Sequence, residues 1–189
     1  MGFLLQTDTF LFKLFNIKTA NPVFDFLMPF ITNGTTWIIP GLAALALMLI
    51  KEKKQALYIV GLALVTVACT DLLCVRVLKP LFARLRPCHP AILVEGGRFL
   101  LGNKTSFSFP SAHAMNTFGQ AFLFSYFYRQ RWYWFFCLAA LIGYSRVYMG
   151  VHFPMDVAGG ALGGVACAIM IIGLAKQVRV LYNKYRNES

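Results

Sequence analysis

The strongest constraint on this chain is a series of long apolar segments separated by short charged turns. Residues 56–78, for example, reach the length of about 20 residues that a helix needs to cross a bilayer. The mean hydropathy is +0.62. Only 13% of the residues are charged, whereas a soluble domain carries about a quarter. We therefore predict an all-α integral membrane protein.

We expect a bundle of about five membrane-spanning helices in a single domain, residues 1–189. No hydrophilic linker and no internal repeat divides the chain. Basic turns at residues 51–54 and 129–131 end two of the apolar runs, as is typical of loops at a membrane surface. The predicted spans are residues 37–50 with their flanks, 56–78, 112–128, 132–144 and 157–175.

Residues 1–31 differ from the other apolar segments because charged residues interrupt them at Asp8, Lys13, Lys18 and Asp25. That pattern favours helices lying in the membrane interface. A short or tilted sixth span in this region stays open as an alternative.

The formal net charge of +11 would suggest nucleic acid in a soluble protein. In a membrane protein it instead indicates anionic lipid head groups, a phosphorylated substrate, or both. We therefore expect the bilayer and a lipid phosphate as partners, and no nucleic acid.

The spans divide most of the basic residues between two membrane faces. The loops 51–54 and 129–131 and the C-terminal tail hold nine, which makes their face cytoplasmic by the positive-inside rule. The outer face of the predicted inner membrane receives the polar segments 79–111 and 145–156. It holds seven cations, where the rule disfavours them: Arg76, Lys79, Arg84, Arg86, Arg98, Lys104 and Arg146.

The five cysteines do not predict a disulfide framework or a zinc site. Cys69, Cys74, Cys137 and Cys167 lie in apolar segments, where thiols behave as small hydrophobic groups. We expect no metal and no cofactor.

Glycines at positions 159, 160, 163 and 164 form two overlapping G-x-x-x-G pairs in the last span. Such pairs permit close helix contact. They are consistent with a homodimer or with packing inside one bundle, so the choice between monomer and homodimer stays undecided.

The segment from Ser145 to Asp156 carries more chemistry than a structural turn needs. Pro154 favours the first position of a new helix. His152 then precedes the helix, and Asp156 lies in its first turn, from which a carboxylate can reach a ring nitrogen of the histidine. Two explanations stay open at this point: a functional pair, or an aspartate that favours the positive helix end beside a satisfied polar histidine.

Two further segments share the outer face. Lys79 and Arg86 lie seven residues apart and are followed by Pro87, and Pro110-Ser111-Ala112-His113 precedes the third span. A phosphate group accounts for these segments together. Arginine offers a bidentate fork and lysine a point charge, while N–H groups at a helix start capped by Ser111 bind an anion.

Lys-x6-Arg-Pro, Pro-Ser-x-His and Ser-Arg-x5-His-x3-Asp, in this order, resemble the three-part signature of the type 2 phosphatidic acid phosphatase superfamily. The resemblance covers residues 79–156. One departure is Ala112, where the family usually has glycine. The backbone N–H survives this change, so only the fine geometry of the loop is in doubt.

The resemblance implies metal-independent hydrolysis of a phosphate ester or diphosphate through a phosphohistidine. His152 would attack phosphorus, and Asp156 would hold its ring and stabilise the imidazolium. His113 would protonate the leaving oxygen and then help to activate water. The phosphoryl oxygens would be bound by Lys79, Arg86, Ser111, the Ala112 N–H and Arg146.

We thus expect a membrane lipid-phosphate phosphatase with its site on the periplasmic face and its C-terminus in the cytoplasm. Candidate substrates are undecaprenyl diphosphate, the 1-phosphate of lipid A, phosphatidylglycerophosphate and phosphatidic acid. A phosphotransferase could use the same residues. A non-enzymatic lipid-phosphate binder or flippase is a further alternative, although binding alone would need only the cations.

Three other polar residues have open interpretations. Arg84 suits a contact behind the site or a solvated loop charge. Asp71 suits a pair with Arg76 or an orienting contact with Lys79. His89 suits a loop role.

Overall fold

The computed structural model describes residues 2–188, which form helices and loops without a β-strand. The α-helices are α1 (Gly2–Lys13), α2 (Pro22–Thr32), α3 (Ile38–Leu72), α4 (Lys79–Phe82), α5 (Ala112–Phe127), α6 (Trp132–Tyr148) and α7 (Pro154–Glu188). Short 3-10 or π-helical turns join some of them at Leu14–Lys18, Gly34–Trp37, Leu73–Leu78 and Arg129–Arg131. The all-α prediction is therefore confirmed.

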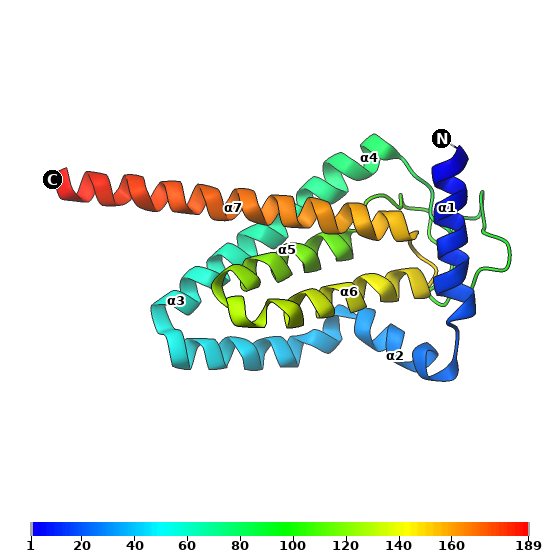
Figure 1. Cartoon of the computed structure of the whole chain (residues 1–189), viewed down its shortest axis with the longest axis horizontal. Helices are drawn as coiled ribbons and strands as arrows, with labels where there is room; N and C mark the ends of the chain where they lie inside the picture. The colour runs from blue at the N-terminus through cyan, green and yellow to red at the C-terminus, as the bar shows by residue number, and fades with distance from the viewer. Residues whose placement is uncertain (1, 189) are drawn as a thin grey trace.

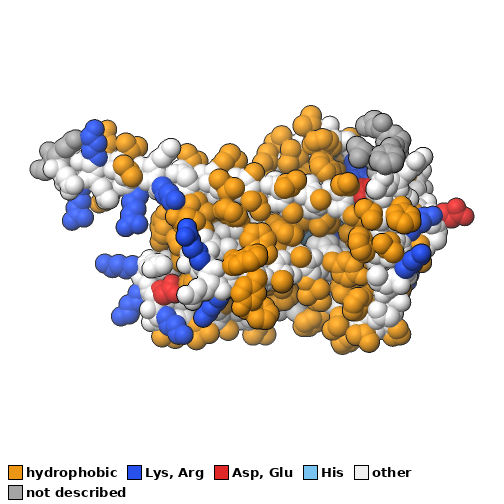
Figure 2. Space-filling model, viewed as in Figure 1, with side chains coloured by type: hydrophobic (Ala, Val, Ile, Leu, Met, Phe, Trp, Pro, Cys, Tyr) orange, Lys and Arg blue, Asp and Glu red, His pale blue; other side chains and the backbone are white. Residues whose placement is uncertain are grey.

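Helices α3, α5, α6 and α7 form a bundle in which α3 folds back on itself (Figure 1). The bend lies at Lys53, which has non-helical backbone angles, inside the predicted turn 51–54. Two helical stretches, Gly34–Phe82 and Pro154–Asn187, are long and apolar enough to cross a membrane by length and composition. Exposed hydrophobic side chains cover the middle of the molecule (Figure 2), as a bilayer requires.

Helices α5 and α7 pack closely because glycines remove the side chains between them. A Cβ on Gly164 would lie 2.1 Å from the Met115 carbonyl oxygen, and one on Gly160 would lie 2.6 Å from that of Ser111. Both glycines of this G-x-x-x-G pair therefore face α5 inside the bundle. The packing explanation of the motif accounts for them without a second chain.

Helix α1 lies across the end of the bundle, next to the start of α7 (Figure 1). Asn16, in the turn after α1, holds it there. Its side-chain Nδ2 donates to the carbonyl oxygens of Arg98 (2.8 Å) and Tyr148 (2.7 Å), and its Oδ1 accepts from Arg98 N–H at 2.7 Å. This one buried amide ties the N-terminal region, the polar loop and the end of α6 together.

The two polar segments lie at the α1 end of the bundle, but their boundaries differ from the prediction. The segment expected as a loop over 79–111 begins with α4, since Pro80 is tolerated in a first helical turn. The segment expected as a loop over 145–156 begins inside α6, which ends at Tyr148. The loop proper starts at Gly150, whose φ of 77° favours glycine.

Candidate active site

His152 is buried at the end of the loop between α6 and α7 and has partners on both ring nitrogens. Its Nδ1 lies 3.4 Å from Asp156 Oδ2 and 3.4 Å from Ser108 Oγ. Its Nε2 lies 3.0 Å from Arg86 Nη1. Arginine has no acceptor atom, so Nε2 must accept this hydrogen bond and the ring proton must be on Nδ1. The lone pair of Nε2 therefore points toward the Arg86 guanidinium.

Asp156 is buried in the first turn of α7, which begins at Pro154 as predicted. Its Oδ2 accepts from the Phe153 N–H at 2.8 Å and from the Ser108 hydroxyl. Its Oδ1 accepts from Arg84 Nη1 at 2.8 Å. The predicted reach of this carboxylate to the His152 ring is confirmed, and the other partners fix its orientation.

Arg84 is the link between Asp156 and the N-terminal helix. Its Nη2 lies 2.6 Å from Asp8 Oδ2, and its guanidinium lies 4.3 Å from the centroid of the Phe153 ring. Asp8 Oδ1 in turn accepts from the Met155 N–H at 2.9 Å. Arg84 thus contacts the residues behind the histidine, and the solvated-charge explanation is wrong.

Asp8 and Ser108 were missed by reasoning from the sequence. Ser108 lies two residues before the Pro110-Ser111 motif, and its position there was the one available signal. Asp8 is 147 residues from Met155 in the chain. No local pattern links them, because the contact arises only when α1 crosses the bundle.

Two predicted phosphate ligands from the first motif lie around the same loop. Arg86 is buried, and besides His152 it contacts the carbonyl oxygens of Val151 (2.9 Å) and Ser106 (2.9 Å). Lys79, in the first turn of α4, donates from Nζ to the Phe107 carbonyl oxygen at 2.6 Å. Both cations therefore hold the segment 106–108 that carries Ser108.

The second motif forms the start of α5. Ser111 is its N-cap, as predicted, and its Oγ accepts from the Ala114 N–H at 3.5 Å. The Ser111 N–H donates to the Asp156 carbonyl oxygen at 2.9 Å, which joins the starts of α5 and α7. Ala112 follows the cap. The ring of His113 is exposed in the first turn and forms no hydrogen bond within residues 2–188.

Arg146 extends from the last turn of α6. Its Nη1 donates to Thr32 Oγ1 at 2.6 Å. Its Nε is buried, and it is one of two buried side-chain nitrogen or oxygen atoms in the described part of the chain that lack a hydrogen-bond partner. A buried unpaired donor on a cation is costly. An anion is the ligand that would satisfy it.

Burial is the main influence on the loop groups that titrate. It lowers the pKa of His152 to about 3, and the hydrogen bond to Asp156 offsets only part of this effect. Burial also lowers the pKa of Arg86 and raises the pKa of Asp8, which contacts with Met155 N–H and Arg84 oppose. The His152 imidazole is therefore neutral near pH 7, as a nucleophile must be.

Other predicted polar residues lie outside this cluster. Arg98 pairs with Asp25 at 2.6 Å and belongs to the anchoring of α2. His89 Nδ1 accepts from Ala91 N–H within the loop. Asp71 is exposed and forms no ion pair with any residue in 2–188, so neither suggested partner is observed. Residues 2–188 contain no group of three or more His, Cys, Asp or Glu side chains that could hold a metal.

Comparison with known proteins points to one family of membrane phosphatases. The family profile described as the PAP2 superfamily matches residues 56–179. Two lipid A 4'-phosphatases are similar. That of Bacteroides thetaiotaomicron is 34% identical over 86% of this chain and 74% of its own length. That of Porphyromonas gingivalis is 32% identical over 87% and 71%.

A solved structure also matches. It is the transmembrane PAP2-type phosphatidylglycerolphosphate phosphatase of Bacillus subtilis, with a TM-score of 0.70 and 25% identity. The match covers 94% of this chain and 89% of that one.

Proposed function

This chain belongs to the PAP2 superfamily, and from that premise we propose how its residues hydrolyse a lipid phosphate. It is a membrane phosphatase that acts on lipids. The observation that carries the proposal is the His152 ring, held between Asp156 at Nδ1 and a cation at Nε2.

His152 acts as the nucleophile. Its Nε2 lone pair attacks phosphorus, the bond from phosphorus to the leaving oxygen breaks, and a phosphohistidine forms. The ring becomes cationic in this step, and Asp156 stabilises that charge through Nδ1–H. Water then attacks phosphorus, releases inorganic phosphate and regenerates the neutral imidazole. No step requires a metal.

His113 protonates the leaving oxygen and then takes a proton from the attacking water. Its ring is exposed at the start of α5, where we place the leaving oxygen of the lipid. Lys79, Arg86, Arg146, Ser111 and the Ala112 N–H bind the phosphoryl oxygens. When substrate binds, Arg86 donates to a phosphoryl oxygen in place of His152 Nε2. The Arg146 Nε–H, which has no partner in the protein, donates to another phosphoryl oxygen.

The membrane arrangement is also a proposal. Five segments cross the bilayer: the two halves of α3, then α5, α6 and α7, while α1 and α2 lie in the outer interface. The support is the distribution of charge. Exposed cations gather at the bend of α3, the α5–α6 turn and the end of α7, opposite the candidate site (Figure 2). This end faces the cytoplasm of a bacterial inner membrane.

A lipid A phosphate is the substrate to test first, because the two relatives named above are lipid A 4'-phosphatases. The experiment is a phosphate-release screen with purified protein. It compares lipid A, undecaprenyl diphosphate, phosphatidylglycerophosphate and phosphatidic acid at equal concentration in one detergent. A rate for lipid A at or below that of the other three would reject this substrate and leave the mechanism intact.

The mechanism has its own test. Wild-type enzyme quenched during turnover of a ³²P-labelled substrate should carry acid-labile, base-stable label on His152. His113→Ala should slow both steps, and His152→Ala should carry no label. EDTA should leave the rate unchanged. Release of phosphate by His152→Ala at the wild-type rate would show that the nucleophile is a different group.

A further inference from the structure

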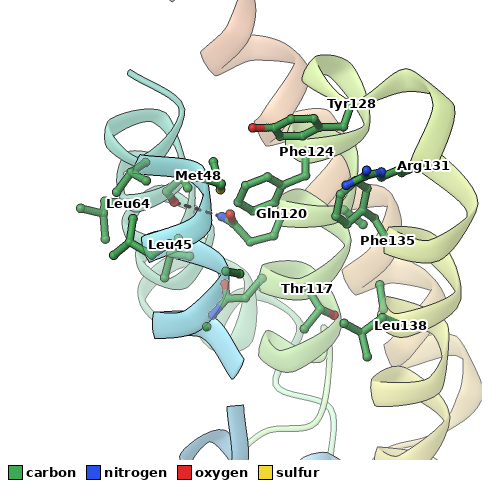
Figure 3. A pocket seen from close by; sticks show the side chains of 18 of the residues that line it. Leu45, Met48, Leu64, Thr117, Gln120, Phe124, Tyr128, Arg131, Phe135 and Leu138 are labelled. Carbon is green, nitrogen blue, oxygen red and sulfur yellow. Dashed lines mark hydrogen bonds between the residues drawn. The ribbon is translucent and has the colours of Figure 1, made fainter. Parts of the chain in front are cut away.

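A groove of about 820 Å³ lies inside the bundle and contains none of the candidate site residues. It is bounded by both halves of α3, by α5 and by α6. Figure 3 shows Leu45, Met48 and Leu64 of α3 across from Phe124, with Phe135 and Leu138 of α6 on the other side. Most of its wall is apolar.

Two uncharged polar side chains of the groove, Gln120 and Asn116, bind other protein groups. Gln120 Nε2 donates to the Ala63 carbonyl oxygen at 3.0 Å, and Asn116 Oδ1 accepts from Thr70 Oγ1 at 2.7 Å. The part of the groove away from the charged residues therefore suits a hydrocarbon chain better than a polar solute.

The charged residues of the groove all lie at the end opposite the candidate site. Lys51, Glu52 and Arg131 line that end. Glu52 Oε2 accepts from the Tyr128 hydroxyl at 2.7 Å. Neither Lys51 nor Arg131 forms an ion pair with another residue in 2–188. Two exposed cations thus border the mouth of an apolar groove, which is the charge pattern that an anionic head group complements.

The length of the groove matches one leaflet. It extends from Asn116 in α5 to Tyr128, the C-cap of that helix; the 12 helical rises between them span about 18 Å. The hydrocarbon core is about 30 Å thick, so the chains of one leaflet fill about 15 Å. A lipid whose phosphate lies at the cationic end would place one acyl chain along the whole groove.

We propose that the groove binds one acyl chain of an anionic phospholipid from the leaflet opposite the candidate site, with the phosphate held by Lys51 and Arg131. An acyl chain is equally apolar in the bilayer and in the groove, so burial alone does not select the ligand. The two cations provide the selection. The occupant is a resident lipid and not the substrate, whose phosphate lies at the other end of the bundle.

Lipid retention tests this site without measuring phosphatase activity. Protein is reconstituted in nanodiscs of equal palmitoyl-oleoyl phosphatidylglycerol and phosphatidylcholine, extracted in mild detergent and examined by native mass spectrometry. We expect one phosphatidylglycerol retained at least tenfold over phosphatidylcholine. Lys51→Gln with Arg131→Gln should abolish this preference. Lys53→Gln with Arg129→Gln, at the same end but outside the groove, should keep it. Equal retention of both lipids by the wild type would overturn the proposal.

A second pair of variants tests the apolar part. Ala44 lines the groove, and neighbouring Ala43 is exposed outside it, so Ala44→Trp should lower retention at least fivefold while Ala43→Trp should not. Equal retention by the two would overturn the proposal. So would slower phosphate release from long-chain substrates by Ala44→Trp with unchanged phosphatidylglycerol retention, because the groove would then hold the substrate chain.

Labelling of the wild type avoids any effect of substitution on folding. Phosphatidylglycerol with a photoreactive diazirine in one acyl chain should label peptides from residues 116–142. Label confined to the outer surface of α7 would overturn the proposal.

Discussion

Asp8 Oδ2 lies 2.6 Å from Arg84 Nη2, although 76 residues separate them in the chain. The same arginine contacts Asp156 at 2.8 Å, and Asp156 orients the candidate nucleophile. Two side chains, Arg84 and Asp156, thus connect Asp8 to His152, and we infer that Asp8 is a positioning residue.

We predict that Asp8→Asn lowers kcat about tenfold with little change in KM, in the range seen when an outer partner of a site ligand is removed. The substitution also leaves Arg84 without its second carboxylate, and breaking a buried pair costs about 3–5 kcal/mol. Steady-state kinetics on folded, monodisperse protein measure the effect. Asp25→Asn, which disrupts the Arg98 pair in α2, serves as the control and should leave kcat near wild type. A rise in KM with unchanged kcat would contradict the positioning role.

The free energy of unfolding should decrease as the pH is lowered below 6.5, because of His152. Burial lowers its pKa to about 3 in the folded protein, whereas an unfolded histidine has a pKa of about 6.5. Between pH 6.5 and pH 3 the unfolded chain binds a proton at His152 that the folded protein does not bind. The free energy of unfolding therefore has its full value above pH 6.5 and decreases as the pH falls toward 3. The slope approaches about 1.4 kcal/mol per pH unit. Thermal unfolding in detergent from pH 7.5 to 4.5 measures it, and His152→Gln should unfold with a shallower pH dependence. Parallel curves for the two proteins would refute the assignment.

The contact between α5 and α7 gives a prediction about packing. A Cβ at Gly164 would lie 2.1 Å from the Met115 carbonyl oxygen, so Gly164→Ala must separate the helices and should cost about 1–3 kcal/mol. It should also reduce activity, because Ser111 and Asp156 lie at the starts of these two helices. Gly173→Ala is the matched control in the same helix, since nothing lies within 4 Å of its Cβ position. That variant should gain about 0.5–1 kcal/mol. The melting temperatures of the two variants should therefore move in opposite directions.

Replacing Arg146 should lower activity without lowering stability. Its buried Nε has no partner, and leaving a buried donor unsatisfied costs about 1–3 kcal/mol, which an apolar side chain of similar length does not incur. Arg146→Met should thus keep or raise the melting temperature. It should also lower kcat by about 10²–10³, the cost of removing one donor to transition-state charge. Activity within twofold of wild type would remove Arg146 from the phosphate site.

The parts of the structure that depend on local chemistry could be predicted from the sequence. Ser111 and Pro154 mark the starts of α5 and α7 because capping and the missing proline N–H are properties of single residues. Helix α6 continues past its predicted end at residue 144 because residues 145–148 contain no helix breaker. The first breaker is Gly150. Asp8 and Asn16 could not be assigned, since their partners are set by how α1 crosses the bundle and not by any periodic pattern.

The hydrogen bond from Met155 N–H to Asp8 joins the first helix to the last. During synthesis, α1 leaves the ribosome long before residues 155 and 156 exist. The buried carboxylate of Asp8 can pair with Arg84 earlier, but its contact with the Met155 N–H forms only after α7 has inserted. A nascent chain that stops before α7 lacks Asp156, which lies in the first turn of that helix. Nothing then orients His152, so partly made protein cannot dephosphorylate the membrane lipids around it.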